Sequence, residues 1–189
     1  MRADREKWDQ RYRQHPDLGG DRPSALVVRW AQHLTGPVLD LAGGTGRNAL
    51  YVARLGLPVV VVDISREALH LLHRVVRAEQ LPVRLVQADL EDFPLPEEQF
   101  GTILNIRYLQ RSLFPAIKKA VRPGGLVLVE TFLMEQQMLG HPRNPEHLLH
   151  RGELSTVFAD FQTLEEQEGL LKDNGPAYLA RLVARRPQP

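Results

Sequence analysis

Short apolar segments alternate with longer amphipathic segments along most of the chain. Five apolar runs, each bounded by Gly, Pro, Asp or Asn and rich in β-branched residues, occupy residues 38–42, 59–62, 83–86, 103–106 and 126–129. Runs of this length that are apolar throughout are typical of strands buried on both faces of a parallel sheet. The pattern therefore predicts five parallel strands.

Amphipathic segments separate the first three of these runs. Residues 47–55 and 65–80 carry apolar side chains three and four positions apart, which is the spacing of one helix face. Ser65 is a favourable N-cap for the second of these helices. A strand, a helix and a strand in that order form a βαβ unit, so we expect the first strands to pair in parallel through crossover helices.

The end of the chain has a different pattern. Residues 161–171 and 177–185 are two further extended segments, and the sequence Lys172-Asp-Asn-Gly175 between them is rich in turn-forming residues. This spacing predicts a hairpin whose two strands are antiparallel. We therefore expect an α/β fold with a doubly wound, mostly parallel seven-stranded sheet and a C-terminal antiparallel hairpin.

Composition restricts the possible functions. The 189 residues are 43% hydrophobic, which is enough for one core, so we expect a single domain over residues 1–189. The chain has 24 basic and 23 acidic residues, and the net charge of +1 gives no reason to expect a nucleic-acid or membrane partner. Cysteine is absent, which excludes disulfides, thiolate metal sites and a cysteine nucleophile. No apolar segment resembles a signal peptide or a membrane span, so we expect a cytoplasmic protein. We expect it to be a monomer or a homodimer.

A glycine-rich segment, Asp40-Leu-Ala-Gly-Gly-Thr-Gly46, follows the first apolar run. Parallel strands end at one edge of a sheet, where glycines let the backbone pass close to a ligand and the next helix presents its N-terminal amides. At this edge the Asp40 carboxylate can accept hydrogen bonds from an ammonium group or from loop amides. The alternative is that Asp40 only holds the loop in place. In either case the segment predicts a binding loop.

Two kinds of ligand are compatible with such a loop. The segment from Gly44 to Ala49 fits the pattern G-x-G-x-x-A, and Asp63 follows about 20 residues later, as in dinucleotide-binding proteins. An NAD(P)-dependent oxidoreductase is therefore one interpretation, although no tyrosine in this chain has a lysine four residues later. A noncatalytic nucleotide-binding module is another. Pairs of histidines three residues apart, His70 with His73 and His147 with His150, have no carboxylates that would complete a metal site, so no metal is expected.

The glycine loop and several later segments together resemble the class I S-adenosylmethionine-dependent methyltransferases. The loop is similar to the family's acid-x-Gly-x-Gly-x-Gly motif. The segment Val59-Val-Val-Val-Asp-Ile-Ser65 resembles the family's second strand, and Gln87-Ala-Asp-Leu90 resembles its adenine-binding loop. Residues 100–105 resemble the family's fourth strand, and residues 122–132 resemble its next turn together with the fifth strand. Small-molecule methyltransferases of the tellurite-resistance type often open with an element like Trp8-Asp-Gln-Arg-Tyr12.

Two positions depart from the family pattern. Ala42 occupies the place where the family usually has its first glycine, and Gly101 occupies the place where an aspartate commonly begins the fourth strand. The first change affects the shape of the loop, and the second removes a frequent polar contact. Neither changes the expected fold.

The resemblance implies S-adenosyl-L-methionine as the cofactor and in-line methyl transfer to a small-molecule acceptor. It implies that Asp40 orients the methionine ammonium, that Asp63 accepts from the ribose hydroxyls, and that Asp89 accepts from the adenine amine, unless Asp89 only caps a turn. Residues 1–20 would form a helical lid over the cofactor. The residues that it implies around the cofactor are Trp8, Tyr12, Asp40, Ala42, Gly43, Gly44, Gly46, Asn48, Asp63, Ile64, Asp89, Leu90 and Asn105.

Basic residues that follow the fourth and fifth strands suggest how the acceptor is held. They are Arg107, Arg111 and Arg143, and guanidinium groups at this edge would hold a small anionic acceptor through paired hydrogen bonds. His141 is the candidate general base, with Tyr108 and Phe132 as walls of the site. The alternative is that the arginines pair with Glu130 or Glu135 at the surface and that His141 is a solvated loop residue.

Overall fold

The computed structural model describes residues 2–18, 20–173 and 175–188. Met1, Gly19, Asn174 and Pro189 lie outside the described residues. Parts of the predicted lid over residues 1–20 and of the predicted turn over residues 172–175 therefore fall outside the description.

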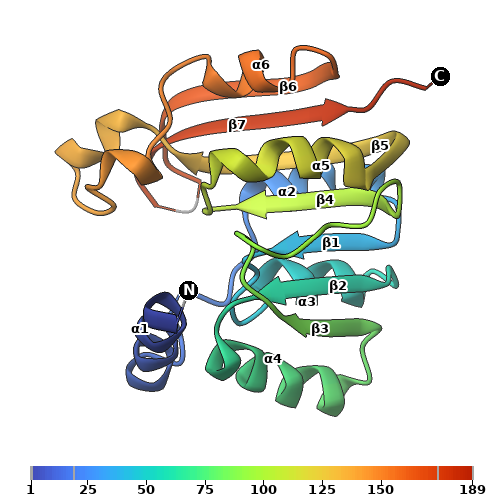
Figure 1. The fold of residues 1–189 in the computed structure, drawn as a ribbon, viewed down its shortest axis with the longest axis vertical. Coiled ribbons are helices and arrows are strands. Elements are labelled where there is room, and N and C mark those ends of the chain that lie inside the picture. Colours follow the sequence, from blue (N-terminus) through green and yellow to red (C-terminus); the bar gives the residue numbers. More distant parts are fainter. Residues whose placement is uncertain (1, 19, 174, 189) are drawn as a thin grey trace.

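One seven-stranded sheet forms the centre of the molecule, with the strand order β3-β2-β1-β4-β5-β7-β6 (Figure 1). The strands are β1 (Val38–Leu41), β2 (Val59–Asp63), β3 (Val83–Gln87), β4 (Phe100–Ile106), β5 (Val121–Phe132), β6 (Gln162–Leu171) and β7 (Ala177–Arg185). The first five strands pair in parallel, and β7 pairs antiparallel with both β5 and β6. The predicted fold class, including the C-terminal antiparallel hairpin, is confirmed.

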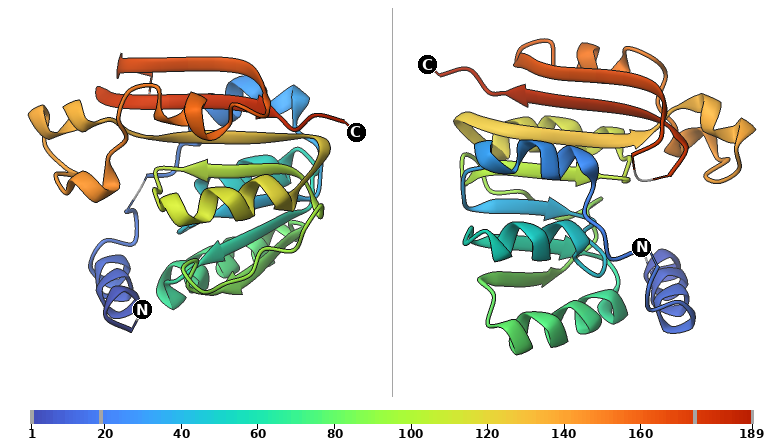
Figure 2. Two further views of the ribbon diagram at one scale, coloured as in Figure 1. Left: turned by 45° about the horizontal axis from the view of Figure 1, so that its top comes forward. Right: turned by 180° about the vertical axis from the view of Figure 1, so that it is seen from behind.

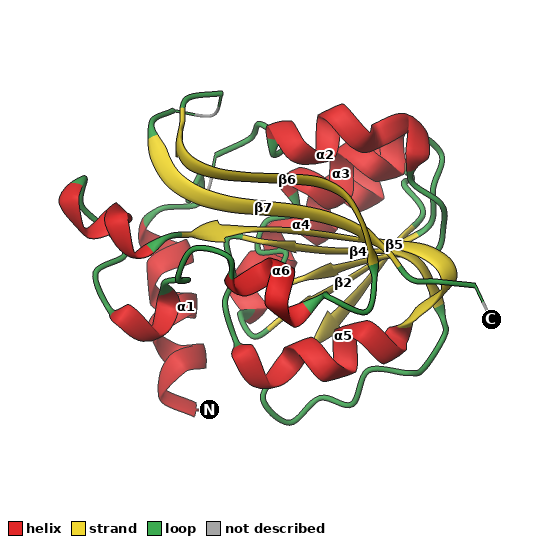
Figure 3. Ribbon diagram, turned by 90° about the horizontal axis from the view of Figure 1, so that it is seen from above, coloured by secondary structure: helices red, strands yellow, loops and turns green. Residues whose placement is uncertain are grey.

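Helices cover both faces of the sheet (Figures 2 and 3). The α-helices are α1 (Arg2–Gln14), α2 (Ala25–Trp30), α3 (Arg47–Arg54), α4 (Arg66–Glu79), α5 (Phe114–Ala120) and α6 (Glu153–Val157), and the 3₁₀ helices are η1 (Ala31–His33), η2 (Arg111–Leu113), η3 (Met134–Met138) and η4 (Pro145–His147). Helices α2, α3 and α4 lie on one face, and α5 and α6 lie on the other (Figure 3). Among the described helices, none combines the length and apolar character that a membrane crossing requires.

Each face of the sheet has its own apolar core. On one face Leu26, Val52 and Leu72 pack from α2, α3 and α4, and on the other face Ile117 and Phe158 pack from α5 and the end of α6. Burial on both sides explains why β1, β2 and β4 are mostly apolar, whereas the edge strand β3 is only partly buried and carries Arg84. The predicted N-cap is also confirmed, because the Ser65 hydroxyl accepts a hydrogen bond from the backbone amide of Ala68 at the start of α4.

The segment that was expected to turn before the fifth strand belongs to β5, which begins at Val121 opposite Phe100 of β4. The backbones approach closely here, since a Cβ atom on Gly101 would lie 2.6 Å from the Thr35 carbonyl oxygen. Glycine is therefore required at position 101, which is a physical reason for the departure from the aspartate of the family pattern. The hydroxyl of the neighbouring Thr102 donates a hydrogen bond to the same Thr35 carbonyl oxygen, at 2.9 Å.

Candidate functional site

The glycine loop lies between the carboxyl end of β1 and the beginning of α3. Gly44 and Gly46 have positive φ angles of 57° and 81°. A Cβ atom on Gly46 would also lie 2.5 Å from a Leu72 methyl group, so the loop packs directly on α4. Ala42 adopts φ of 51°, which places an alanine in the left-handed region that glycine occupies without strain. The loop therefore has the conformation that a glycine-rich loop requires in spite of the alanine.

Asp40 is buried beneath this loop, with an exposed fraction of 1%. It accepts a hydrogen bond from the backbone amide of Ala49 in the first turn of α3, and its Oδ2 atom has no partner among the described residues. Burial raises the pKa of Asp40 to about 7, while the Arg47 charge and the Ala49 amide act in the opposite direction. One carboxylate oxygen is thus available to a ligand that enters above the loop.

Asp63 ends β2 and is also buried. One of its oxygens accepts from the Gly44 amide at 2.7 Å, and the other accepts from the Ser65 amide at 2.8 Å. Burial raises the pKa of Asp63, and both of these amides oppose that shift. Because a carboxylate oxygen can accept more than one hydrogen bond, Asp63 is held in position and can still accept from ligand hydroxyls.

Asn105 lies near the end of β4, opposite Leu41 of β1. Its side chain has an exposed fraction of 1%, and neither the amide oxygen nor the amide nitrogen has a hydrogen-bond partner in the described part of the chain. An unpaired buried amide is costly, so Asn105 is a candidate contact for a ligand.

The remaining predicted cofactor residues have local roles. Asn48 accepts a hydrogen bond from the Ser24 amide at 2.9 Å and so attaches the N-terminal segment to α3. Asp89 accepts from the Glu91 amide at 3.1 Å, which is the turn-capping role considered as the alternative. Leu90 is buried, and Ile64 is half-buried next to Asp63. The structure therefore brings a binding loop, two carboxylates and an amide to one edge of the sheet.

Helix α1 lies across this edge, beside the beginning of α4 (Figure 1). Its buried Asp9 accepts hydrogen bonds from the Ser65 hydroxyl at 2.7 Å and from the Glu67 amide at 3.1 Å. The Tyr12 hydroxyl meets the glycine loop so closely that a Cβ atom on Gly44 would lie 2.5 Å from it. Sequence reasoning singled out Trp8 and Tyr12 but missed Asp9, which lies between them.

Arg107 follows β4 directly, and its φ angle of 63° is unusual for a residue with a side chain. Its Nε atom donates to Glu130 Oε1 at 2.9 Å, and the guanidinium lies 4.6 Å from the centre of the Phe132 ring. Pairing with Glu130 was the alternative to binding an anionic acceptor for Arg107. The side chain nevertheless keeps 21% of its surface exposed, so it is only partly enclosed by the protein.

Glu130 and Arg181 form a buried ion pair that sequence reasoning missed. Each side chain is 1% exposed, and Arg181 Nε donates to Glu130 Oε2 at 2.6 Å. Arg181 also binds Asp173 through both terminal nitrogens, at 2.7 and 3.3 Å. Glu130 and Arg181 are direct partners in the antiparallel pairing of β5 and β7. A charged residue within the apolar part of each strand, Glu130 in β5 and Arg181 in β7, was the signal for this pair.

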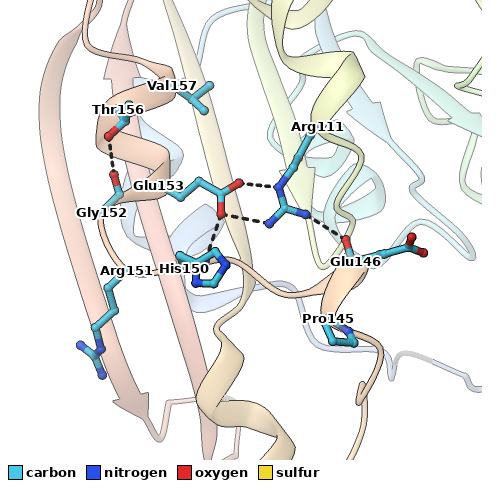
Figure 4. A pocket seen from close by; sticks show the side chains of 9 residues that line it. All are labelled: Arg111, Pro145, Glu146, His150, Arg151, Gly152, Glu153, Thr156 and Val157. Atoms are coloured by element: carbon cyan, nitrogen blue, oxygen red, sulfur yellow. Dashed lines mark hydrogen bonds and ion pairs between the residues drawn. The ribbon is translucent and has the colours of Figure 1, made fainter.

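Arg111 is held firmly by the loop that precedes α6 (Figure 4). It binds Glu153 through two hydrogen bonds, at 2.6 and 3.0 Å, and donates to the carbonyl oxygens of Glu146 and Leu148. These contacts line an open cavity of about 600 Å³ beside α6. Arg111 thus fixes this loop, and its partner is Glu153, not Glu130 or Glu135 as in the surface-pair alternative.

His141 and Arg143 lie in the exposed loop between η3 and η4. Their carbonyl oxygens accept from Gln136 and Gln137, and their side chains make no hydrogen bond or ion pair within the described chain. The segment between β5 and α6 projects from the edge that carries the glycine loop (Figure 1). The roles predicted for these two residues stay predictions. No cluster of three or more potential metal ligands occurs among the described residues.

Comparison with known proteins gives consistent results. Residues 38–125, just under half of the chain, match a family described as a methyltransferase domain. The chain is 31% identical over 108 residues to an uncharacterized methyltransferase, YodH, of Bacillus subtilis, covering 55% of this chain and 46% of that one. It is 30% identical over 125 residues to a malonyl-[acyl-carrier protein] O-methyltransferase of Enterobacter lignolyticus, covering 64% of this chain and 48% of that one. This chain spans about half the length of these relatives.

The fold is also similar to solved structures. The crystal structure of TehB from Haemophilus influenzae superposes with a TM-score of 0.74 at 25% sequence identity, over 87% of this chain and 62% of TehB. The family match begins at the first residue of β1, and it therefore includes the glycine loop, Asp63 and Asn105.

Proposed function

We propose that this chain, whose predicted similarity to the class I S-adenosylmethionine-dependent methyltransferases is confirmed by its sequence match and its fold, transfers a methyl group from S-adenosyl-L-methionine to a small-molecule acceptor. The observation that carries the proposal is the set of buried polar atoms without partners, Asp40 Oδ2 and the Asn105 amide, near a glycine loop. The same similarity favours this activity over an NAD(P)-dependent oxidoreductase.

The residues at this edge fit the chemistry of the cofactor. Asp40 has an unpartnered oxygen that would accept from the methionine ammonium. Asp63 is fixed by two backbone amides and would accept from the ribose hydroxyls. Ile64 would cover one face of the adenine, and Asp89 would accept from the adenine amine beside the backbone amide of Leu90. Gly43 and Gly46 let the loop pack closely on Val61 and Leu72, and Gly44 would leave room for the ligand once Tyr12 moves away with α1.

Bound S-adenosyl-L-methionine supplies an electrophilic methyl group on a positively charged sulfur. The protein has to exclude water and to align the acceptor with this group. Asn105, buried at the end of β4, would orient the groups next to the methyl carbon. His141 is the proposed base for an oxygen or nitrogen acceptor, because its imidazole is exposed and not engaged by the described chain.

Helix α1 would act as the lid of the cofactor site. Asp9 attaches the helix to the first turn of α4, next to Asp63, and Tyr12 contacts Gly44. Because Tyr12 abuts the glycine loop in this closed arrangement, cofactor exchange requires α1 to move. Trp8, which packs on Tyr12 with ring centres 6.1 Å apart, would move with it.

The proposal is tested by measuring the formation of S-adenosylhomocysteine. The protein is incubated with S-adenosyl-L-methionine and a panel of small thiols, amines, carboxylic acids and oxyanions, including tellurite. We expect acceptor-dependent product with the wild type and none with Gly44→Val, in which a bulky residue replaces a glycine with positive φ at the loop. A wild-type protein that binds NADH and forms no product with any acceptor would contradict the proposal.

A further inference from the structure

We infer that Arg107 is the anchor for an anionic oxygen group of the methyl acceptor, and that the buried Glu130 is the residue that positions it. This inference rests on the proposed methyl transfer and adds the chemical class of the acceptor. Four observations carry it: the position of Arg107, the hydrogen bonds of its guanidinium, the charge balance around Glu130 and the unpaired amide of Asn105.

Arg107 lies at the edge of the sheet that carries the cofactor site. It follows β4 immediately, two residues after Asn105, and its backbone amide donates to the Glu130 carbonyl at 2.6 Å. Its charge interacts with that of Arg47, the first residue of α3 after the glycine loop. The guanidinium is therefore close to the place where the methyl donor is proposed to bind.

The two arginines that bind Glu130 use their guanidinium groups differently. Arg181 is 1% exposed, and all three of its nitrogens are bonded, one to Glu130 and two to Asp173. Arg107 is 21% exposed and uses only its Nε atom. Among the described residues, nothing accepts a hydrogen bond from its two terminal nitrogens. Arg181 is thus a closed structural group, whereas Arg107 keeps a pair of donors for a ligand.

Arg107 shares its carboxylate partner with Arg181. Glu130 is shared, because its second oxygen accepts from Arg181 at 2.6 Å and from the Ser24 hydroxyl at 3.0 Å. Asp173 balances Arg181 at the far end of the cluster. Burial lowers the pKa of the Arg107 guanidinium below its usual value, and the nearby positive charges of Arg47 and Arg181 add to the effect, although Glu130 opposes it. An anionic ligand would stabilise the charged form of the Arg107 guanidinium.

The geometry of the group specifies the ligand chemistry. Glu130 holds Nε, and the guanidinium carbon lies 4.6 Å from the centre of the Phe132 ring, so the side chain is fixed by two contacts. Two adjacent N–H donors on a rigid plane match a carboxylate or another oxyanion. The nearby buried amide of Asn105 offers one donor and one acceptor to the same ligand. The acceptor is therefore a small molecule with an anionic oxygen group.

The test compares small carboxylic acids with their primary amides as methyl acceptors, and uses tellurite and phosphate as the oxyanion arm. Turnover is measured as S-adenosylhomocysteine formation with wild type, Arg107→Gln, Arg107→Lys and the control Arg54→Gln. Arg54 pairs with Glu79 on the exposed side of α3, so the control removes a paired arginine away from the site. The affinity for S-adenosyl-L-methionine is measured on each protein by calorimetry.

We expect wild type to use an anionic acceptor and to reject its neutral analogue. Arg107→Gln should raise KM for that acceptor about 10- to 100-fold, Arg107→Lys less, and neither should change cofactor affinity more than about twofold. Equal turnover of acids and amides, no turnover of any anion by a protein that binds the cofactor, or wild-type KM in Arg107→Gln would overturn the inference. If the wild type does not bind S-adenosyl-L-methionine at all, the proposed function itself is wrong.

Glu130 is tested separately, because a purely structural role would lower stability without changing selectivity. Glu130→Gln keeps the shape of the side chain and an oxygen that can accept from Arg107, but it removes the charge. If Glu130 positions Arg107, the variant at a temperature where it is folded should show a raised KM for the anionic acceptor with unchanged kcat. An unchanged KM in folded Glu130→Gln would refute the positioning role.

Discussion

The two halves of the carboxyl edge hold their buried carboxylates in opposite ways. Under the glycine loop, Asp40 and Asp63 are bonded by backbone amides, and burial raises the pKa of both. Beyond β4, Glu130 is bonded by two guanidinium groups. The first half therefore offers acceptors to a ligand that carries hydroxyl and ammonium donors, and the second offers donors to an anion. In the proposed function, one sheet edge would recognise two substrates of opposite chemistry.

The largest effect is expected from removing the carboxylate of the second half. Glu130→Ala leaves Arg181 buried with only Asp173 as its partner, and breaking a buried ion pair in this way costs about 3–5 kcal/mol of unfolding free energy. Denaturant unfolding of the variant measures this loss. Glu79→Ala, which breaks an exposed pair with Arg54, is the matched control and should leave the unfolding midpoint nearly unchanged. Equal midpoints in the two variants would show that Glu130 is not a structural centre.

A smaller effect is expected from the first half. Asp63→Ala removes the acceptor for ribose hydroxyls and should weaken the binding of S-adenosyl-L-methionine by about 1–3 kcal/mol. Because Asp63 also accepts from the Gly44 and Ser65 amides, the ligand-free protein should lose stability as well. Calorimetry and thermal unfolding measure the two effects. Asp92→Ala, an exposed aspartate in the loop after β3, is the control. Unchanged affinity in Asp63→Ala would remove Asp63 from the cofactor site.

The pH dependence of stability distinguishes the two halves without a ligand. The pKa of Asp40 is raised from 3.8 to about 7, so between these values the folded protein holds a proton that the unfolded chain has lost. Stability should therefore fall as the pH rises from 4 to 7, by at most about 1.4 kcal/mol per pH unit for this group. Asp40→Asn should reduce the slope of stability against pH. Part of the slope should remain in this variant, because the pKa of Asp63 is also raised. Identical slopes in wild type and Asp40→Asn would contradict the buried position of Asp40.

The smallest effect concerns the attachment of the lid. Asp9→Ala removes the acceptor for the Ser65 hydroxyl and the Glu67 amide, and losses of this kind cost about 1 kcal/mol. Since α1 is joined to the body through this contact, the variant should also release S-adenosyl-L-methionine faster. Stopped-flow dissociation measures the release. Asp17→Ala, at an exposed position after α1, should behave as the wild type. An unchanged release rate in Asp9→Ala would mean that this contact does not control the lid.

The sequence predicts the first half of the edge better than the second. The strands were recognisable because each is short, mostly apolar and rich in β-branched residues, and Ser65 was recognisable as a cap because N-caps are local features. The glycine loop and Asp63 lie within one βαβ unit, so their proximity follows from chain order. Here the interpretation of the motif and the structure agree.

The second half depends on contacts between distant parts of the chain. Glu130 and Arg181 are 51 positions apart, and they meet only because β5 and β7 pair in one register. Asp9 and Ser65 are 56 positions apart and meet only when α1 docks on α4. No local pattern specifies such pairings, and Glu130 was therefore considered only as an alternative surface partner of the arginines. The same limitation affected Arg111, whose partner Glu153 is 42 positions away, at the beginning of α6.

Titration of the wild-type protein with S-adenosyl-L-methionine by isothermal calorimetry, with NADH as the comparison, tests the central claim most directly. The account predicts saturable binding of S-adenosyl-L-methionine to one site per chain, no binding of NADH, and loss of S-adenosyl-L-methionine binding in Gly44→Val. Binding of NADH in preference to S-adenosyl-L-methionine, or undiminished binding by a folded Gly44→Val variant, would contradict the assignment of the glycine loop as the methyl-donor site.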